Sequence, residues 1–574
     1  MDVNSTSTTR SAAGQEENYP KSLCKRSFFA RPLPRGERVY FILLQLILLN
    51  ITEATAEVYF QAFVVKYYGE ELSEAASIPS FISFRSFPLL LCLPMGFIAD
   101  RYFGRAKVLY YSWISQFVAQ LIFGFYFAFA NLNNHSVPIS GVFILFIGLF
   151  INCCSLAGIR VNLIPFGVDQ MRTASSDELS SYFHWYYWCR NLGHFFSYII
   201  GGSLVASTNS VFAFVFTSVA ATGGVVINLL GYEWFTKREK VGNPLLLVYH
   251  VLRYAATAKR PAERTAFSYD GRPEPSRIDL AKETHHGIFR DEQVEDVKTF
   301  LRILVFMISL FGFLCVYSSL SNVYLTQSTY LQQPKFLENS TVPYCSHNNI
   351  TVNYVNKIYS TYWILLINNA AILLLIPILD RIVYPLCCPW VPSMFSRMAV
   401  GMVACVFSIC CAIVVEVFRY NSLQSNFEIN DFKYTKVFSA TIPVGVMAPS
   451  FFIQAIAECL TLITMVEFIY AQSPVYMKGL LLGCLFFTEG LAMTLGSLLF
   501  LSQSKGTQLY WQYFKVIKDD ICDALQSTNT PDAGSCLSAY IIIAVITFLG
   551  TLLFLYSAKH YKIRIRGSAL RYFL

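Results

Sequence analysis

The dominant feature of this sequence is a series of long apolar runs separated by polar gaps. A helix needs about 20 mainly apolar residues to cross a bilayer. The chain is 55% hydrophobic and only 14% charged, whereas roughly a quarter of the residues of a soluble protein are charged. We therefore predict an all-α membrane protein with twelve transmembrane helices. The expected spans are 38–66, 76–99, 106–130, 138–166, 181–205, 210–235, 299–327, 354–379, 393–419, 440–472, 475–502 and 536–560.

The expected spans form two groups of six around a polar segment. This arrangement predicts a cytoplasmic N-terminal tail, a six-helix bundle, a cytoplasmic linker, a second six-helix bundle and a cytoplasmic C-terminal tail. We interpret the linker as a flexible tether, with an amphipathic stretch near Leu245 to Tyr254 as the alternative. The N-terminal tail lacks the pattern of a signal peptide, so the first helix is expected to target the chain. The predicted boundaries are 1–38, 39–235, 236–298, 299–560 and 561–574.

The net charge of +8 raises the question of a nucleic-acid partner. The lysines and arginines gather, however, before the first span, in the linker and after the last span. Membrane proteins carry such an excess of basic residues on their cytoplasmic side. The charge therefore indicates topology, and we expect no nucleic-acid partner.

Three Asn-X-Ser/Thr sequons lie in gaps that this topology places outside the cytoplasm, where glycosylation takes place. They begin at Asn134, Asn339 and Asn349, and they predict a glycoprotein. Cys522 and Cys536 lie in another such gap. A disulfide between them is one of the pairings open to these cysteines.

A tight turn from Gly96 to Arg105 connects the second and third spans. An acid and basic residues on such a cytoplasmic turn can form ion pairs that hold one conformation of a protein with two states. We expect Asp100, Arg101 and Arg105 to act in this conformational gating. The turn resembles the loop shared by transporters of the major facilitator superfamily. This resemblance implies two six-helix bundles around a central substrate site.

Three further stretches are similar to signatures of the proton-coupled oligopeptide transporters, solute carrier family 15. They run from Gly158 to Gln170, from Phe183 to Gly193 and from Glu458 to Lys478. The resemblance extends over about residues 40–560. Two short segments resemble the peptide/histidine transporter branch in particular; these are Val294 to Lys298 and Ile376 to Pro385.

The family resemblance implies a substrate site between the bundles. Glu458, Asn191 and Asn368 match the positions that hold the amino terminus of a peptide, and Arg160 stands in place of a lysine that faces the carboxylate. A zwitterion in a low-dielectric cavity needs an acidic partner for its ammonium and a cation for its carboxylate. Packing between helices is the alternative role for the asparagines, and a structural ion pair is the alternative for Glu458.

The first span departs from the family pattern Glu-x-x-Glu-Arg. Glu53 aligns with the first glutamate, Ala56 with the second, and Glu57 with the arginine. Two acids one helical turn apart bring like charges together, which favours protonation of one of them. We expect Glu53, Glu57 and Glu458 to take part in proton coupling. Arg85 is predicted either to pair with one of the first two acids or to line the pore by itself.

These features predict proton-coupled symport of di- or tripeptides, or of histidine, by alternating access. Transport without protons is a variant of this hypothesis. The alternative is a transporter-like receptor or scaffold with weak, altered or uncoupled transport, which the changed first span favours. The charges retained within the membrane favour transport.

We expect no enzymatic activity, catalytic residue, metal site or cofactor, with the proton as the coupling ion. The predicted partners are a small peptide or amino acid and the lipid bilayer, with a cytoplasmic adaptor as a further candidate. The protein is expected to be monomeric. It is expected to lie in the plasma membrane or an endolysosomal membrane.

Overall fold

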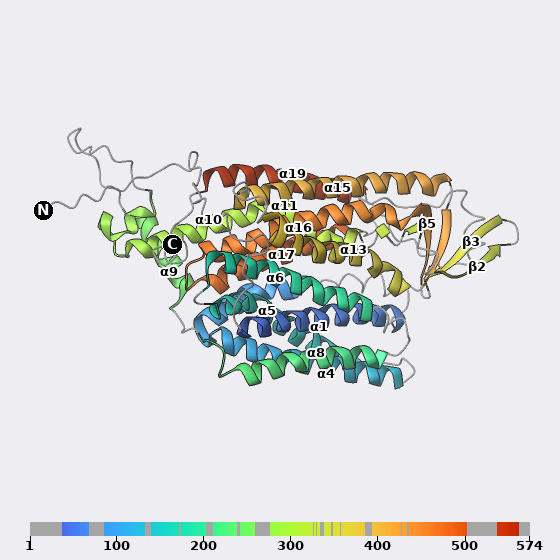
Figure 1. Cartoon of the computed structure of the whole chain (residues 1–574), viewed down its shortest axis with the longest axis horizontal. Helices are drawn as coiled ribbons and strands as arrows, with labels where there is room; N and C mark the ends of the chain where they lie inside the picture. The colour runs from blue at the N-terminus through green and yellow to red at the C-terminus, as the bar shows by residue number, and fades with distance from the viewer. Residues whose placement is uncertain are drawn as a thin grey trace.

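The structure is a computed structural model, in which long helices lie roughly parallel to one another (Figure 1). Most helices in the membrane region consist mainly of apolar residues, as a lipid environment requires. The described residues are 37–67, 85–132, 139–171, 174–201, 210–237, 242–258, 276–324, 327–328, 330–332, 338–345, 348–355, 357–384, 393–425, 427–432, 435–501 and 537–561.

The first half of the chain forms one group of helices, drawn in blue to green in Figure 1. Two of its helices continue directly into a short π-helical segment, η3 after α3 and η4 after α6. Ser175 and Glu178 form a capping box at the start of α6, which fixes where this helix begins. The elements are α1 (Glu37–Tyr67), α3 (Phe87–Ile98), η3 (Ala99–Phe103), α4 (Arg105–Leu132), α5 (Ile139–Asp169), α6 (Ser176–Phe196), η4 (Ser197–Gly201) and α8 (Ser210–Gly231).

The second half forms another group, drawn from yellow-green to red in Figure 1. Its first two helices are bent by 47° at their junction. The elements are α10 (Asp291–Ser309), α11 (Phe311–Ser319), η8 (Leu320–Tyr324), α13 (Lys357–Ile378), η10 (Leu379–Val383), α15 (Met394–Ser425), η11 (Val444–Met447), α16 (Ala448–Gln472), α17 (Lys478–Leu501) and α19 (Leu537–His560).

Every expected span coincides with a helix in the described part of the chain. By length and composition, nine described helices can cross a membrane, or ten if α10 and α11 form one span. The two other expected spans correspond to α3, of which 12 residues are helical, and to α6, which carries many polar side chains. The prediction of an α-helical membrane domain is therefore confirmed, while the composition of the helices alone supports fewer spans than twelve.

The two halves meet along α3 and α6 of the first half. Helix α3 packs along α17, and α6 packs along α13 and α16. Gly96 and Gly479 lie where α3 approaches α17, and a Cβ atom on Gly96 would collide with the carbonyl oxygen of Gly479. The absence of a side chain at Gly96 therefore permits this close approach of the two backbones.

A five-stranded sheet lies at the opposite end of the molecule from helix α9 (Figure 1), and no strand was expected from the sequence. The strand order is β1-β5-β4-β3-β2, and β3 pairs with β4 in parallel. The sheet thus joins two chain segments that are far apart in sequence. The strands are β1 (Leu331–Gln332), β2 (Glu338–Cys345), β3 (Asn348–Val355), β4 (Phe427–Phe432) and β5 (Thr435–Pro443).

The sheet changes two details of the sequence interpretation. The tenth expected span begins later than residue 440, because β5 continues to Pro443 and α16 begins at Ala448. The sequon residues Asn339 and Asn349 lie in β2 and β3 rather than in irregular loops. Asn134, Cys522 and Cys536 fall outside the described residues.

The segment between the halves contains helix α9 (Pro244–Thr257) and the short 3₁₀ turns η6 (Asp279–Ala281) and η7 (Glu283–His285). Helix α9 covers the predicted amphipathic stretch. It buries Val248 and Val251 and exposes Leu245 and Tyr249.

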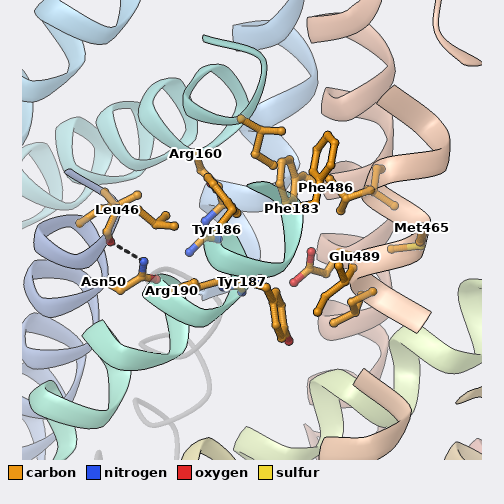
Figure 2. Close-up of a pocket in the computed structure, with 16 residues that line it drawn as sticks. Leu46, Asn50, Arg160, Phe183, Tyr186, Tyr187, Arg190, Met465, Phe486 and Glu489 are labelled. Atoms are coloured by element: carbon orange, nitrogen blue, oxygen red, sulfur yellow. Dashed lines mark hydrogen bonds between the residues drawn. The ribbon is translucent and has the colours of Figure 1, made fainter. Parts of the chain in front are cut away.

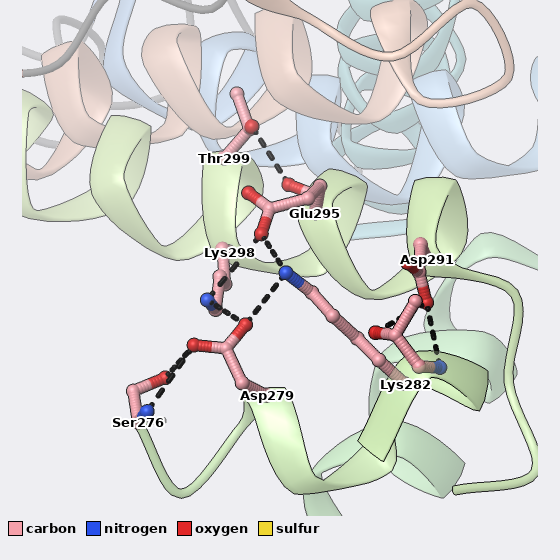
Figure 3. Close-up of polar contacts among 8 residues, drawn as sticks. Ser276, Asp279, Lys282, Asp291, Glu295, Lys298 and Thr299 are labelled. Atoms are coloured by element: carbon pink, nitrogen blue, oxygen red, sulfur yellow. Dashed lines mark hydrogen bonds and ion pairs between the residues drawn. The ribbon is translucent and has the colours of Figure 1, made fainter. Parts of the chain in front are cut away.

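Residues 276–290 fold back onto α10 through a cluster of charges, shown in Figure 3. Lys282 lies 2.7 Å from Asp279 and 2.5 Å from Glu295. Lys298 contacts the same two acids. This part of the segment is therefore held on the second half and is not a plain tether.

Candidate functional site

A pocket lies between the two halves (Figure 2). Helices α1, α5 and α6 line it from the first half, and α16 and α17 line it from the second. Its walls are mostly apolar, and a few polar and charged side chains face one another across it. The polar lining residues are Asn50, Arg160, Tyr186, Tyr187, Arg190 and Glu489.

Arg160 of α5 is paired with Glu53 of α1. Its Nη2 atom donates hydrogen bonds to both carboxylate oxygens of Glu53, and both side chains are buried. The residue expected to bind a substrate carboxylate is thus held by a residue expected to accept a proton. Opening this pair would make the guanidinium available to another anion.

Glu57 has an arginine partner of its own. Arg85 Nε lies 2.7 Å from the carboxylate of Glu57, and Arg85 Nη2 donates to the hydroxyl of Tyr198 at 3.0 Å. The structure therefore supports pairing as the role of Arg85. A separate guanidinium compensates each of the two carboxylates, Arg160 for Glu53 and Arg85 for Glu57.

Glu458 of α16 does not line the pocket, but its carboxylate contacts both halves of the molecule. Tyr187 of α6 donates its hydroxyl to Glu458 Oε2 at 2.8 Å, and Asn368 of α13 donates Nδ2 to Oε1 at 3.3 Å. Asn191 instead donates Nδ2 to the backbone carbonyl of Tyr187 at 2.8 Å. The structure thus brings Glu458 and Asn368 together and leaves Asn191 one turn away along α6.

Two charged residues of the pocket were not among the residues expected from the sequence. Arg190 of α6 lines it with its guanidinium 5.8 Å from the ring centre of Tyr187, and Glu489 of α17 lines it from the opposite half. A signal for Glu489 was present, because an acid within an apolar run is costly and usually functional. Among the described residues, no group of His, Cys, Asp and Glu side chains could hold a metal ion.

The turn between α3 and α4 connects the halves at the end of the molecule that carries α9. Arg105 lies 2.7 Å from Asp169 and 3.2 Å from Asp100. Asp100 also accepts a hydrogen bond from the backbone N–H of Leu480 at 3.1 Å, in the first turn of α17. The first N–H groups of a helix have no partner within it, so an acid there satisfies one and complements the helix dipole.

The other residue of the expected gate lies apart from these contacts. The guanidinium of Arg101 is 4.7 Å from the ring centre of Tyr102 and 5.8 Å from that of Phe97. The structure therefore brings Asp100 and Arg105 together and places Arg101 against aromatic rings.

A second contact between the halves lies in the turn after α13. Asp380 of η10 accepts a hydrogen bond from Ser181 Oγ of α6 at 3.2 Å, and Arg381 lies 3.5 Å from the same carboxylate. Each half thus contributes one acid that binds a helix of the other half. Both contacts must open if the halves separate at this end.

Two helical halves with a charged pocket between them define a membrane protein of the two-bundle transporter type. A model of the POT family, PTR2, matches residues 111–516. The chain belongs to the POT family, as its sequence signatures predicted.

Curated relatives include members of solute carrier family 15. The chain is 25% identical over 377 residues to member 3 of that family from Rattus norvegicus. The aligned region covers 62% of this chain and 60% of the relative. It is 24% identical over 253 residues to member 5 from Homo sapiens, covering 42% of each chain. The matched region thus spans about 60% of the length of the rat relative.

Solved structures of the family share the fold. A crystal structure of an auto-inhibited POT family peptide transporter matches with a TM-score of 0.63 and 16% identity, covering 94% of this chain and 100% of the other. The in meso structure of the POT family transporter PepTSo matches with a TM-score of 0.64 and 16% identity. This match covers 93% of this chain and 100% of the other. A POT family structure in complex with 5-aminolevulinic acid matches with a TM-score of 0.54 and 14% identity. This match covers 91% of this chain and 96% of the other. The predicted major facilitator fold is thereby confirmed.

Proposed function

We propose that the protein is a proton-coupled symporter of short peptides or of an amino acid such as histidine. The observation that carries this proposal is a buried ion pair between Glu53 and Arg160, whose arginine lines a pocket between two transporter halves. The ligand of one related structure, 5-aminolevulinic acid, has an amine and a carboxyl group, as a peptide or an amino acid has.

Proton coupling would act through Glu53. An arginine does not release its proton in a useful pH range, so Glu53 would be the member of this pair that takes up the coupling proton. A proton on Glu53 removes the charge that holds Arg160, and the guanidinium then binds the carboxylate of the substrate. Glu458, with Asn368 and Asn191 nearby, would receive the ammonium group.

Alternating access would require the contacts at the α9 end of the molecule to open. We assign this end to the cytoplasm on the basis of the basic residues in the linker. Asp100 and Arg105 on one side and Asp380 on the other hold the halves together there. The proposed topology puts the sheet, with Asn339 and Asn349, on the opposite side of the membrane.

The test is uptake of a labelled dipeptide and of labelled histidine into proteoliposomes, with and without an inward proton gradient. Wild type is expected to accumulate substrate only with the gradient. Glu53→Gln and Glu458→Gln are expected to lose this accumulation. Glu467→Gln is the matched control, because Glu467 lies on α16 like Glu458 but has no part in the proposed site.

The other outcomes of this test have definite meanings. Uptake by wild type that is independent of the proton gradient would contradict proton coupling and indicate a uniporter. Binding of substrate without any uptake would contradict transport and favour the receptor or scaffold.

A further inference from the structure

The charges around the pocket are not all compensated in the same way. Arg160 is held by Glu53, and Glu57 is held by Arg85. Within the described part of the chain, neither Arg190 nor Glu489 has a hydrogen bond or an ion pair. The two residues therefore form a second pair of opposite charges whose members do not contact each other.

Both residues are placed to meet a ligand. Figure 2 shows the carboxylate of Glu489 pointing from α17 toward the side chains of the first half. Glu489 is only 5% exposed, and Arg190 is half-buried. The two side chains line the same pocket but form no ion pair with each other in the described part of the chain.

A purely structural role does not account for this arrangement well. Charged groups within a membrane protein are costly, and structural ones are paired. The guanidinium carbon of Arg190 lies 5.8 Å from the ring centre of Tyr187, and a guanidinium carries five N–H donors that can bind an anion such as a carboxylate. Two uncompensated opposite charges across an enclosed pocket suit a ligand that carries both signs itself.

We propose that Arg190 and Glu489 bind the two ends of a zwitterion, Arg190 its carboxylate and Glu489 its ammonium group. This inference rests on the proposed function for the class of substrate, and it adds a binding position that does not use the Arg160 and Glu53 pair. Because Arg190 belongs to α6 and Glu489 to α17, the ligand bridges the two halves. It would occupy the pocket while Arg160 is still held by Glu53.

The apolar part of the lining selects the side chain of the ligand. Leu462, Ile463, Leu485 and Phe486 come from the second half, and Phe183 comes from the first. These residues offer no hydrogen bonds from their side chains. The pocket therefore favours zwitterions with an apolar or aromatic side chain over those with an additional charge.

The experiment is equilibrium binding to the full-length protein in lipid nanodiscs. The probes are alanyl-phenylalanine, its N-acetyl derivative, its C-terminal amide and alanyl-aspartate. Wild type is expected to bind the parent dipeptide about tenfold or more tightly than any of the other three, as is typical of a lost charged hydrogen bond. Arg190→Gln is expected to lose the preference for the free carboxylate, and Glu489→Gln the preference for the free amine.

Matched variants separate binding from folding. Arg397→Gln removes another buried arginine that lies over a ring, 5.3 Å from the centre of Tyr384, but away from the pocket. Glu467→Gln is the control for Glu489→Gln. Both controls are expected to keep the wild-type preferences, and Arg190→Lys is expected to retain the preference for the carboxylate.

Two outcomes would overturn the inference in different ways. Wild type could bind the dipeptide normally while Arg190→Gln and Glu489→Gln keep its preferences for the free carboxylate and the free amine. This result would exclude the two residues from the binding site and leave the proposed function intact. A wild type that is correctly folded and binds none of the probes would overturn the proposed function and this inference together. Binding with the expected preferences but without uptake in proteoliposomes would support this site and contradict transport.

Discussion

At the scale of single residues, the first transmembrane helix shows how arginines compensate buried acids. Glu53 and Glu57 lie one turn apart, and each meets a guanidinium from a different helix. Arg160 lines the pocket and is held by Glu53, and we assign this pair to coupling. The pair of Glu57 and Arg85, with Tyr198, lies outside the pocket lining and is better suited to a structural role.

The structural role of Glu57 predicts a specific pattern of stability. Removing one partner of a buried pair leaves the other charge uncompensated, at a cost of about 3–5 kcal/mol. Glu57→Gln and Arg85→Gln are each expected to lower the thermal unfolding temperature. The double variant is expected to lower the unfolding temperature by less than the sum of the two single changes, because it leaves no buried charge without a partner. Intrinsic tryptophan fluorescence during heating measures this, and strictly additive losses would contradict the pairing.

At the scale of elements, the segment before α10 is held by a cluster of charges. Burial acts to raise the pKa of Asp279, but hydrogen bonds from Lys282, Lys298 and Ser276 outweigh it and keep the pKa below its ordinary value. Burial acts to lower the pKa of Lys282, but its hydrogen bonds to Asp279 and Glu295 raise it overall. Both shifts show that the charged forms stabilise this docked segment.

These shifts set the pH range in which the segment stays docked. The contribution of Asp279 to the stability of the docked segment is complete above the ordinary carboxyl pKa of about 4. It is lost as the pH falls through the lower pKa that Asp279 has in the folded protein. Hydrogen exchange of residues 276–290, corrected for intrinsic rates, is therefore expected to show protection that persists at pH 5 and disappears only in stronger acid, below about pH 4. Asp279→Asn is expected to reduce protection already at neutral pH. Loss of protection in wild type near pH 6 would contradict this assignment.

At the scale of the whole molecule, two acids connect the halves at one end. Asp100 binds the first turn of α17, and Asp380 accepts a hydrogen bond from Ser181 of α6. Because these contacts are few, the relative stability of the closed arrangement depends on individual hydrogen bonds. A hydrogen bond to a charged group contributes about 1.5–3 kcal/mol of stability. This is enough to change the ratio of closed to open molecules tenfold or more.

Removing Asp100 is therefore expected to favour separation of the halves at this end. Spin labels on the exposed positions Phe103 and Ile382 report the distance between the two turns. Asp100→Ala is expected to increase the population with the longer distance by about tenfold. Arg101→Ala is the matched control from the same turn, because Arg101 lies against aromatic rings and has no hydrogen bond or ion pair to α17 among the described residues. An equal shift in both variants would contradict a specific role for Asp100.

The sequence by itself determined the properties that depend on neighbouring residues. A span is a continuous apolar run, so all twelve expected spans contain helix in the described chain. Local signatures also indicated the family and drew attention to Glu458, Asn368, Asp100 and Arg105. Interactions with lipid and within one helix are local, and they leave a pattern in the sequence.

Only the tertiary structure decided which of these residues meet. Arg160 and Glu53 are 107 positions apart, and nothing near either residue specifies the other. The sheet joins β3 to β4 across two intervening helices, and Glu489 faces the pocket only because α17 packs against the first half. Such contacts arise when distant segments pack together, and the energy of a buried charge depends on the partners that this packing brings to it.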